Sequence, residues 1–229
     1  MENNLKVYRS DKFDVENTAS LSLFIYPHSL FVFAKDQNEA NLAIHHYADF
    51  SIKQLDSLLH QDPLLRLSIP AKVYFHSERF ALVPGVLFAL GQEKVYLEFA
   101  GELPEKAYFF SSPLDSNNIQ LVSLVPDKIQ KSLEQRFSEV SYYHGATSFL
   151  SYLFKERFNL IGQEILVYYF HSAIYIAAYT DQAYSEAGAT IVPDAASAIA
   201  AGDIVFKIQR PMTAEEGLDE LGLLRQGQT

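Results

Sequence analysis

The sequence contains no cysteine. It therefore cannot form disulfides, use a thiolate as a nucleophile or bind a metal through sulfur, and the absence is compatible with a reducing compartment. Basic residues are also scarce, with 18 Lys and Arg against 28 Asp and Glu and a net charge of -10. There is no basic run, and nucleic acids and anionic membranes both require a basic surface on their partner. We expect neither as the main partner.

Long apolar segments are lacking as well. The longest run, residues 165–179, is interrupted by His171 and Ser172 and falls short of the roughly 20 residues that span a membrane. The N-terminal stretch MENNLKVYRSD is polar and lacks the apolar centre of a signal peptide. These features predict a soluble cytoplasmic protein.

Two similar apolar stretches organise the chain. Residues 20–35 read SLSLFIYPHSLFVFAK and residues 164–180 read EILVYYFHSAIYIAAYT. Each predicts two short strands joined by a turn, the first at Tyr26-Pro27-His28-Ser29 and the second at Phe170-His171-Ser172. Because each hairpin opens one half of the chain, the pattern predicts a duplicated α/β architecture.

The residues between the hairpins predict further strands and helices. We expect an edge strand or arm in residues 1–18, and a strand at 41–50 whose adjacent His45 and His46 point to opposite faces. Apolar spacing predicts helices after Ser51, after Pro126 and over 147–158. A short strand at 80–84 is expected to lead into a helix. The remaining predicted strands are 71–76, 107–111, 119–125 and 140–143.

Composition changes abruptly after Thr180. No leucine occurs from there until Leu218, and alanine becomes dominant. The turn residues and apolar runs predict a short helix, a strand, an alanine-rich helix and a second strand, which together form a βαβ-type unit.

Residues 19–179 resemble a bacterial domain family of unknown function with the fold of the actin, sugar-kinase and heat-shock-chaperone ATPases. The phrases that carry the resemblance are LFVFAKD, FALVPGVLF, YLEFAGELPE, VSLVPDKIQKSLEQRF and YYHGATSFLSYLF. The resemblance implies an actin-like ATPase (ribonuclease H-like) fold with duplicated lobes.

Residues 182–228 resemble part of the first domain of the proton-translocating nicotinamide nucleotide transhydrogenase alpha subunit, a relative of alanine dehydrogenase. The specific phrases are AYSEAGATIV and DIVFKIQRPMTAEEG. Lys207 and Pro211 match that family's K-x-x-x-P phrase, and the resemblance implies that Lys207 helps to hold substrate or cofactor. The glycine-rich nucleotide-binding turn of that family has no counterpart here.

The two resemblances predict a first lobe over residues 1–158 and a second, truncated lobe over 159–229, completed by the βαβ-type unit. The chain thus resembles a chimera, natural or artificial.

ATPases of the actin-like fold hold phosphate with D-x-G-type turns, one in each lobe. Here Pro27, His28 and Ser29 occupy the first turn, and His171 and Ser172 occupy the second. Proline removes an N–H donor, and neither turn has an acid or a glycine. We interpret both as degenerate phosphate turns, with His28 and His171 as capping residues rather than a functional pair.

Other signatures of chemistry are absent. There is no G-x-G-x-x-G, G-x-x-x-x-G-K-[ST], H-E-x-x-H or G-x-S-x-G. His45, His46 and Asp49 suggest a metal site, but the strand geometry separates the histidines. His144 is interpreted as a residue at the start of a helix rather than as a general base. We therefore predict no catalytic residue, cofactor or metal.

The favoured hypothesis is a non-catalytic protein-interaction module with a protein partner. The first alternative is a fragment of a nucleotide enzyme related to the transhydrogenase alpha subunit or alanine dehydrogenase. The second is an artificial chimera with no evolved function.

Overall fold

The computed structural model describes residues 4–99, 101–114, 118–156, 163–170 and 173–180. These fall into two compact units. The first holds β1 to β9 and most of α4, and the second holds the hairpin of β10 and β11.

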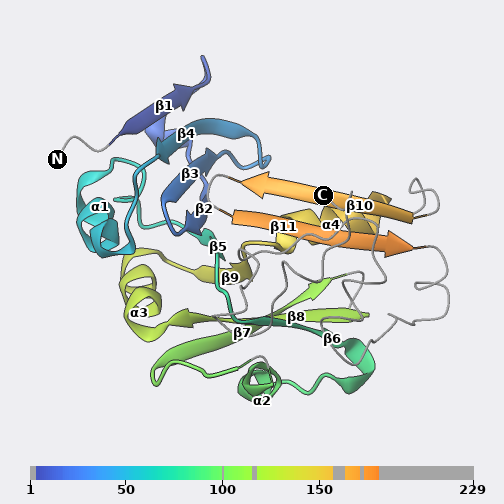
Figure 1. Cartoon of the computed structure of the whole chain (residues 1–229). Coiled ribbons are helices and arrows are strands. Elements are labelled where there is room, and N and C mark those ends of the chain that lie inside the picture. Colours follow the sequence, from blue (N-terminus) through green and yellow to red (C-terminus); the bar gives the residue numbers. More distant parts are fainter. Residues whose placement is uncertain (1–3, 100, 115–117, 157–162, 171–172, 181–229) are drawn as a thin grey trace, which may run out of the picture. The chain divides into compact units, whose positions relative to one another are not determined.

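A six-stranded mixed sheet forms the centre of the first unit (Figure 1). Its strands in spatial order are β1 (Leu5–Arg9), β4 (Asn41–Tyr47), β3 (Ser29–Lys35), β2 (Ser20–Tyr26), β5 (Ala71–Phe75) and β9 (Val140–His144). Strands β2, β5 and β9 run parallel, and the other neighbours are antiparallel. The predicted first hairpin and the edge strand in the N-terminal arm are therefore both confirmed.

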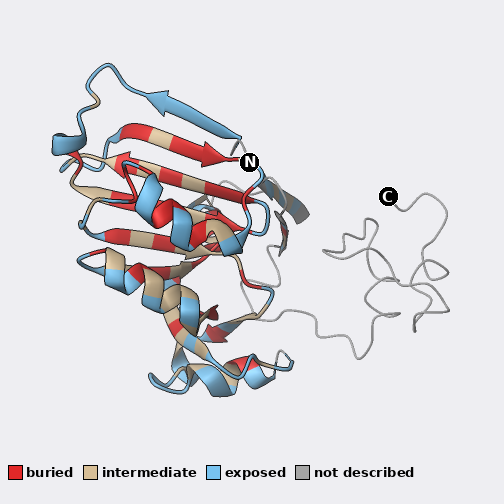
Figure 2. Ribbon diagram, turned by 90° about the vertical axis from the view of Figure 1, so that its left-hand side faces the viewer, coloured by how far each residue is buried: buried red, intermediate tan, exposed pale blue. Residues whose placement is uncertain are grey.

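The sheet buries the alternating residues of β2 on one face. Leu21 and Leu23 are fully buried and Ile25 nearly so, because every second side chain of a strand points to the same side. They join one core with Leu55 and Leu58 of α1. Figure 2 shows this buried sheet, with β1 exposed at its edge.

Helices α1 (Leu55–Gln61) and α3 (Asp127–Arg136) lie on the same side of this sheet (Figure 1). Leu55, Leu58 and Leu59 recur at helical spacing and are all buried. The 3-10 turn η2 (Ile52–Gln54) precedes α1, and the amide of Ser51 donates to Gln54 Oε1 at 2.7 Å. The helices predicted after Ser51 and Pro126 are thus confirmed.

The opposite face of the sheet carries aromatic rings on neighbouring strands. Phe24 stacks on Tyr74 with centroids 4.4 Å apart, and Tyr74 stacks on Tyr143 at 5.1 Å. Phe33 meets the edge of Phe24 at 5.4 Å. Such cross-strand aromatic pairs stabilise a sheet beyond the apolar area that they bury.

A three-stranded antiparallel sheet is inserted between β5 and β9. Its order is β6 (Phe80–Pro84), β8 (Ile119–Pro126) and β7 (Ala107–Leu114). The expected helix directly after β6 is only the 3-10 turn η3 (Gly85–Leu87), and α2 (Glu93–Glu98) begins later. Gly91, with φ of +83°, lies between η3 and α2, in a conformation that breaks a right-handed helix.

The 3-10 turn η1 (Val15–Asn17) follows β1, and α4 (Thr147–Glu156) follows β9. In the second unit β10 (Gln163–Phe170) pairs with β11 (Ala173–Thr180), so the second predicted hairpin is present. The βαβ-type unit expected in residues 182–228 lies outside the described residues. Within the described part of the chain, no helix is both long and apolar enough to cross a membrane.

Candidate functional site at the carboxyl ends of the parallel strands

The parallel strands β2, β5 and β9 end side by side, at Tyr26, Phe75 and His144. In open α/β sheets, ligands bind outside the carboxyl ends of such strands. This edge of the sheet is therefore the first place to look for a functional site. The turn that we interpret as a degenerate phosphate turn follows β2 directly.

Aromatic rings fill this position. The Tyr26 ring stacks on His76 with centroids 5.8 Å apart, and Phe80 stacks on His144 at 4.5 Å. His76 and His144 lie 6.2 Å apart. Tyr26 is 2% exposed and His144 is fully buried. The edge is thus packed like a core rather than shaped as an open phosphate cradle.

The polar atoms of Tyr26 and His144 bond to the protein itself. The Tyr26 hydroxyl donates to the Gly145 carbonyl at 3.1 Å. The Ala146 amide donates to His144 Nδ1 at 3.1 Å, so His144 Nε2 carries the hydrogen and donates to the Ser77 carbonyl at 2.9 Å. The Ala146 bond ties His144 to the segment that enters α4, as expected for a residue at the start of a helix.

Burial lowers the pKa of His144 to about 4, because the charged imidazolium is poorly solvated there. Burial also lowers the pKa of His76. Both rings are therefore neutral at pH 7. With a proton on Nε2 and an amide bonded to Nδ1, His144 has no nitrogen available to act as a general base.

The turn after β2 places its residues differently. Pro27 and His28 are exposed at the tip, whereas Ser29 is fully buried. The Ser29 hydroxyl lies 3.1 Å from His46 Nε2, and the Phe50 amide donates to the His28 carbonyl at 3.2 Å. These bonds hold the turn against β4, and Pro27 offers no amide to a phosphate.

Three other predicted site residues, His171, Ser172 and Lys207, lie outside the described residues. The interpretation of His28 and His171 as capping residues and the role of Lys207 therefore stay predictions.

His45, His46 and Asp49 do not come together. His45 Nδ1 lies 2.6 Å from Asp62 Oδ2, His46 bonds to Ser29 across the strands, and Asp49 accepts from Asn4 at 3.1 Å. The two histidines thus have separate partners. Among the described residues, no group of three or more His, Cys, Asp or Glu side chains could hold a metal ion.

Asp62, which no sequence pattern singles out, is the centre of a buried polar cluster. Its Oδ2 accepts from Tyr47 and pairs with His45, and its Oδ1 accepts the amides of Leu64 and Leu65 at 2.7 and 3.1 Å. Burial by itself raises the pKa of Asp62, but the hydrogen bonds from His45 and Tyr47 outweigh it and hold the pKa below its usual range. Burial and the Asp62 carboxylate both raise the pKa of Tyr47.

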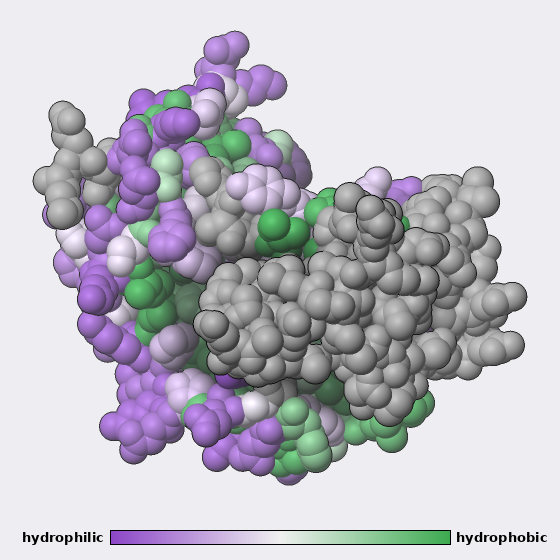
Figure 3. Space-filling view, in the orientation of Figure 1, coloured by the Kyte–Doolittle hydropathy of each residue, from purple (hydrophilic) through white to green (hydrophobic). Residues whose placement is uncertain are grey.

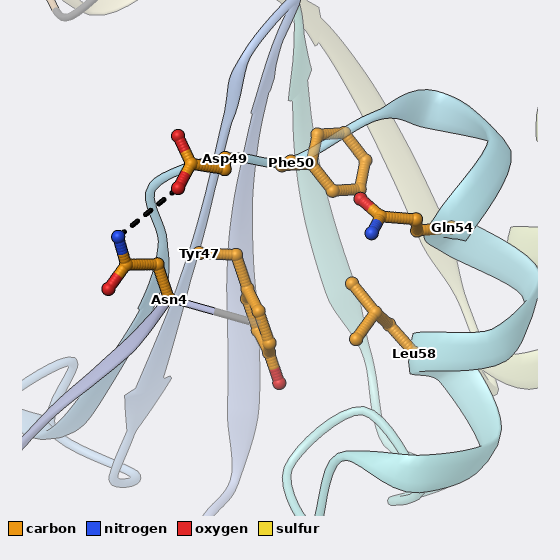
Figure 4. Close-up of a pocket in the computed structure, with 6 residues that line it drawn as sticks. All are labelled: Asn4, Tyr47, Asp49, Phe50, Gln54 and Leu58. Carbon is orange, nitrogen blue, oxygen red and sulfur yellow. Dashed lines mark hydrogen bonds between the residues drawn. The ribbon is translucent and has the colours of Figure 1, made fainter. Parts of the chain in front are cut away.

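An Asp–His pair can activate a nucleophile, but this one has no access to a substrate. His45 is 2% exposed. A cavity of about 10 Å³ lies beside Tyr47, lined also by Phe50 and Leu58 (Figure 4). That volume accommodates at most about one water molecule. The cluster therefore fixes the segment after α1 to β4, and its role is structural.

Comparison with solved structures shows the class of protein. The chain is similar to a Bacteroides thetaiotaomicron protein described as having an actin-like ATPase fold and unknown function. The TM-score is 0.62 with 16% identity, covering 72% of this chain and 66% of that one. The predicted actin-like ATPase fold is thereby confirmed at the level of its α/β architecture. The cytoplasmic domain of EpsL, from the type II secretion system of Vibrio cholerae, gives a TM-score of 0.38 and 11% identity over 73% of this chain and 74% of that one. That likeness is too low to support an assignment.

The chain belongs to the family described as protein of unknown function DUF3822, whose model matches residues 10–184. A second family model, the alanine dehydrogenase/PNT N-terminal domain, matches residues 158–229. The chain is also 55% identical over 51 residues to the first of the polypeptides that make up the NAD(P) transhydrogenase alpha subunit of Rhodospirillum rubrum, and the same match is found in a named strain of that organism. This stretch is 22% of the chain and only 13% of that relative. The predicted mixed resemblance is thus confirmed.

Proposed function

We propose that this protein is a non-catalytic, protein-interaction module with an actin-like fold. One observation carries the proposal: Tyr26, Phe80 and His144 pack the carboxyl ends of the parallel strands, where the fold places its ligand. The hydroxyl of Tyr26 and both ring nitrogens of His144 bond to the backbone. A triphosphate would have to displace this packing without a glycine or carboxylate in the adjacent turn to receive it.

A thermal unfolding experiment with ATP and Mg²⁺ tests this proposal. A ligand present at about 100 times its Kd stabilises the folded state by about 2.7 kcal/mol, which raises the melting temperature by several degrees. We expect no shift with millimolar ATP and Mg²⁺. A shift that needs both components, and is reduced when Tyr26 is replaced by alanine in a variant that still folds, would contradict the proposal.

A second candidate function rests on the transhydrogenase-like segment. The 55% identity over 51 residues supports nicotinamide nucleotide binding that involves Lys207. NADH is expected to quench tyrosine emission under this hypothesis, and Lys207→Ala to abolish the effect. Lys94→Ala is the matched control, because Lys94 is an exposed lysine elsewhere on the chain. Quenching that survives Lys207→Ala, or no quenching at all, would refute this candidate.

The finer architecture is part of the same proposal. We infer that β10 and β11 open a second lobe of the same kind as the first, that a βαβ-type unit in residues 182–228 completes it, and that the protein works in the cytoplasm. The overlap of the two family matches at residues 158–184 supports a chimera with its junction in this region. Spectra of a truncated chain that ends at Thr180 test the completion: an intact second lobe without the segment would refute it.

A further inference from the structure

The segment between β6 and β7 exposes an unusual group of large apolar side chains. Val86 is 94% exposed, Leu87 68%, Leu90 85% and Phe99 88%. Single exposed apolar residues are common, but several on one short segment indicate an interaction surface. We call these four residues the apolar ridge. Figure 3 shows apolar side chains gathered over α2 and the end of β6, along the lower edge of the molecule.

The ridge stands on a fixed base. The Tyr96 hydroxyl donates to the Leu87 carbonyl at 2.8 Å and accepts from the Ala89 amide at 2.7 Å. Phe88 stacks on Tyr96 at 5.8 Å, and Leu97 is fully buried in the core of the inserted sheet. The same segment therefore has an inward apolar side that is satisfied and an outward apolar side that is not. Such a preformed surface loses little conformational entropy when a partner binds.

The charges around the ridge select the partner. Between η3 and β7 the chain carries Glu93, Glu98, Glu102 and Glu105 against Lys94 and Lys106, a net charge of -2. Lys94 lies 3.8 Å from Glu98, so part of the positive charge is already compensated. A second copy of the chain would bring acidic groups against acidic groups, and an anionic membrane would be repelled in the same way. A basic partner is favoured instead.

We propose that the apolar ridge docks an amphipathic helix of a partner protein. The apolar face of that helix covers Val86, Leu90 and Phe99, and its lysines or arginines meet the surrounding carboxylates. This is the helix-in-groove mode of recognition, in which apolar anchors give affinity and charge gives selectivity. The inference rests on the proposed function as an interaction module and specifies the chemistry of its partner.

A binding titration with synthetic peptides tests the ridge. The full chain is titrated into a fluorescent helix of about 18 residues, built from leucine at helical spacing and lysine elsewhere. A second peptide has glutamate in place of every lysine. The triple variant V86S/L90S/F99S changes only exposed apolar side chains and no charge. Y152S, which alters a 59% exposed tyrosine on α4, is the control; circular dichroism checks that both variants fold.

We expect the lysine peptide to bind the wild type and Y152S equally, and the triple variant at least about tenfold more weakly. The glutamate peptide is expected to bind the wild type at least about tenfold more weakly than the lysine peptide. Equal binding of the two peptides, or an unchanged affinity of the triple variant, would overturn the proposal. Ridge-dependent dimerisation in sedimentation, or ridge-dependent pelleting with phosphatidylcholine vesicles, would assign the ridge to another occupant.

The two proposals fail separately. A melting shift with ATP and Mg²⁺ refutes the non-catalytic function whatever the peptides do. Loss of the peptide result without an ATP shift refutes only the ridge.

Discussion

Replacing Asp62 with alanine tests the buried cluster most severely. The substitution removes the acceptor of the Tyr47 hydroxyl, of His45 Nδ1 and of the amides of Leu64 and Leu65. Leaving one buried polar group without a partner costs about 1–3 kcal/mol. The space left by the carboxyl group can admit water, so the losses do not simply add. We expect a total of about 3–5 kcal/mol, as for breaking a buried charged pair.

Urea unfolding followed by far-ultraviolet circular dichroism measures this loss. Asp56→Ala is the matched control, because Asp56 is a half-exposed aspartate on the same helix whose partners are Ser132 and Lys128; it is expected to lose less than about 1 kcal/mol. Tyr47→Phe is expected to cost about 1 kcal/mol in the wild type and less in the Asp62→Ala background, because the two residues share one bond. An Asp62→Ala loss no larger than that of Asp56→Ala would refute the reasoning.

Three further predictions concern the sheet and its ligand edge. Leu23→Ala, at a fully buried position of β2, is expected to cost about 3 kcal/mol in urea unfolding, and Leu82→Ala, at a 46% exposed position, far less; similar costs would contradict the assigned core. The pKa of His144 lies at about 4 in the folded state and at about 6.5 in the unfolded state, so its contribution is complete above pH 6.5 and is lost as the pH falls toward 4. Over that range the wild type should lose up to about 3 kcal/mol relative to His144→Gln, and parallel stability curves would contradict this. Pro27→Gly is expected to lower stability by about 1 kcal/mol through the unfolded chain without creating ATP binding in calorimetry, whereas ATP binding by this variant would show that the turn alone blocks the site.

The sequence could predict what depends on local pattern. The alternation of Leu21, Leu23 and Ile25 predicts which face of β2 is buried, and the spacing of Leu55, Leu58 and Leu59 predicts α1. The separation of His45 from His46 follows from the alternation of side chains along a strand. The helix predicted after Pro84 was wrong, because proline permits the start of a helix but does not supply the apolar face that stabilises one.

Contacts between distant segments could not be predicted. Tyr26 is 119 residues from Gly145, and Asp62 is 17 residues from His45. Nothing in the local sequence of either residue marks its partner, because the sheet order brings them together. The pattern around residues 26–29 shows that a phosphate turn is degenerate, but only the structure shows that the neighbouring strand ends are filled by aromatic rings.

The ionisation of His144 tests the central claim most directly. A ¹⁵N–¹H spectrum of the histidine-labelled protein resolves the protonation of each ring nitrogen. We expect His144 to stay neutral, with its proton on Nε2, from pH 7 down to pH 5, and its signals to remain in place when ATP and Mg²⁺ are added. A ring that titrates near pH 6.5, or moves with the nucleotide, would mean that this edge of the sheet is an open ligand site.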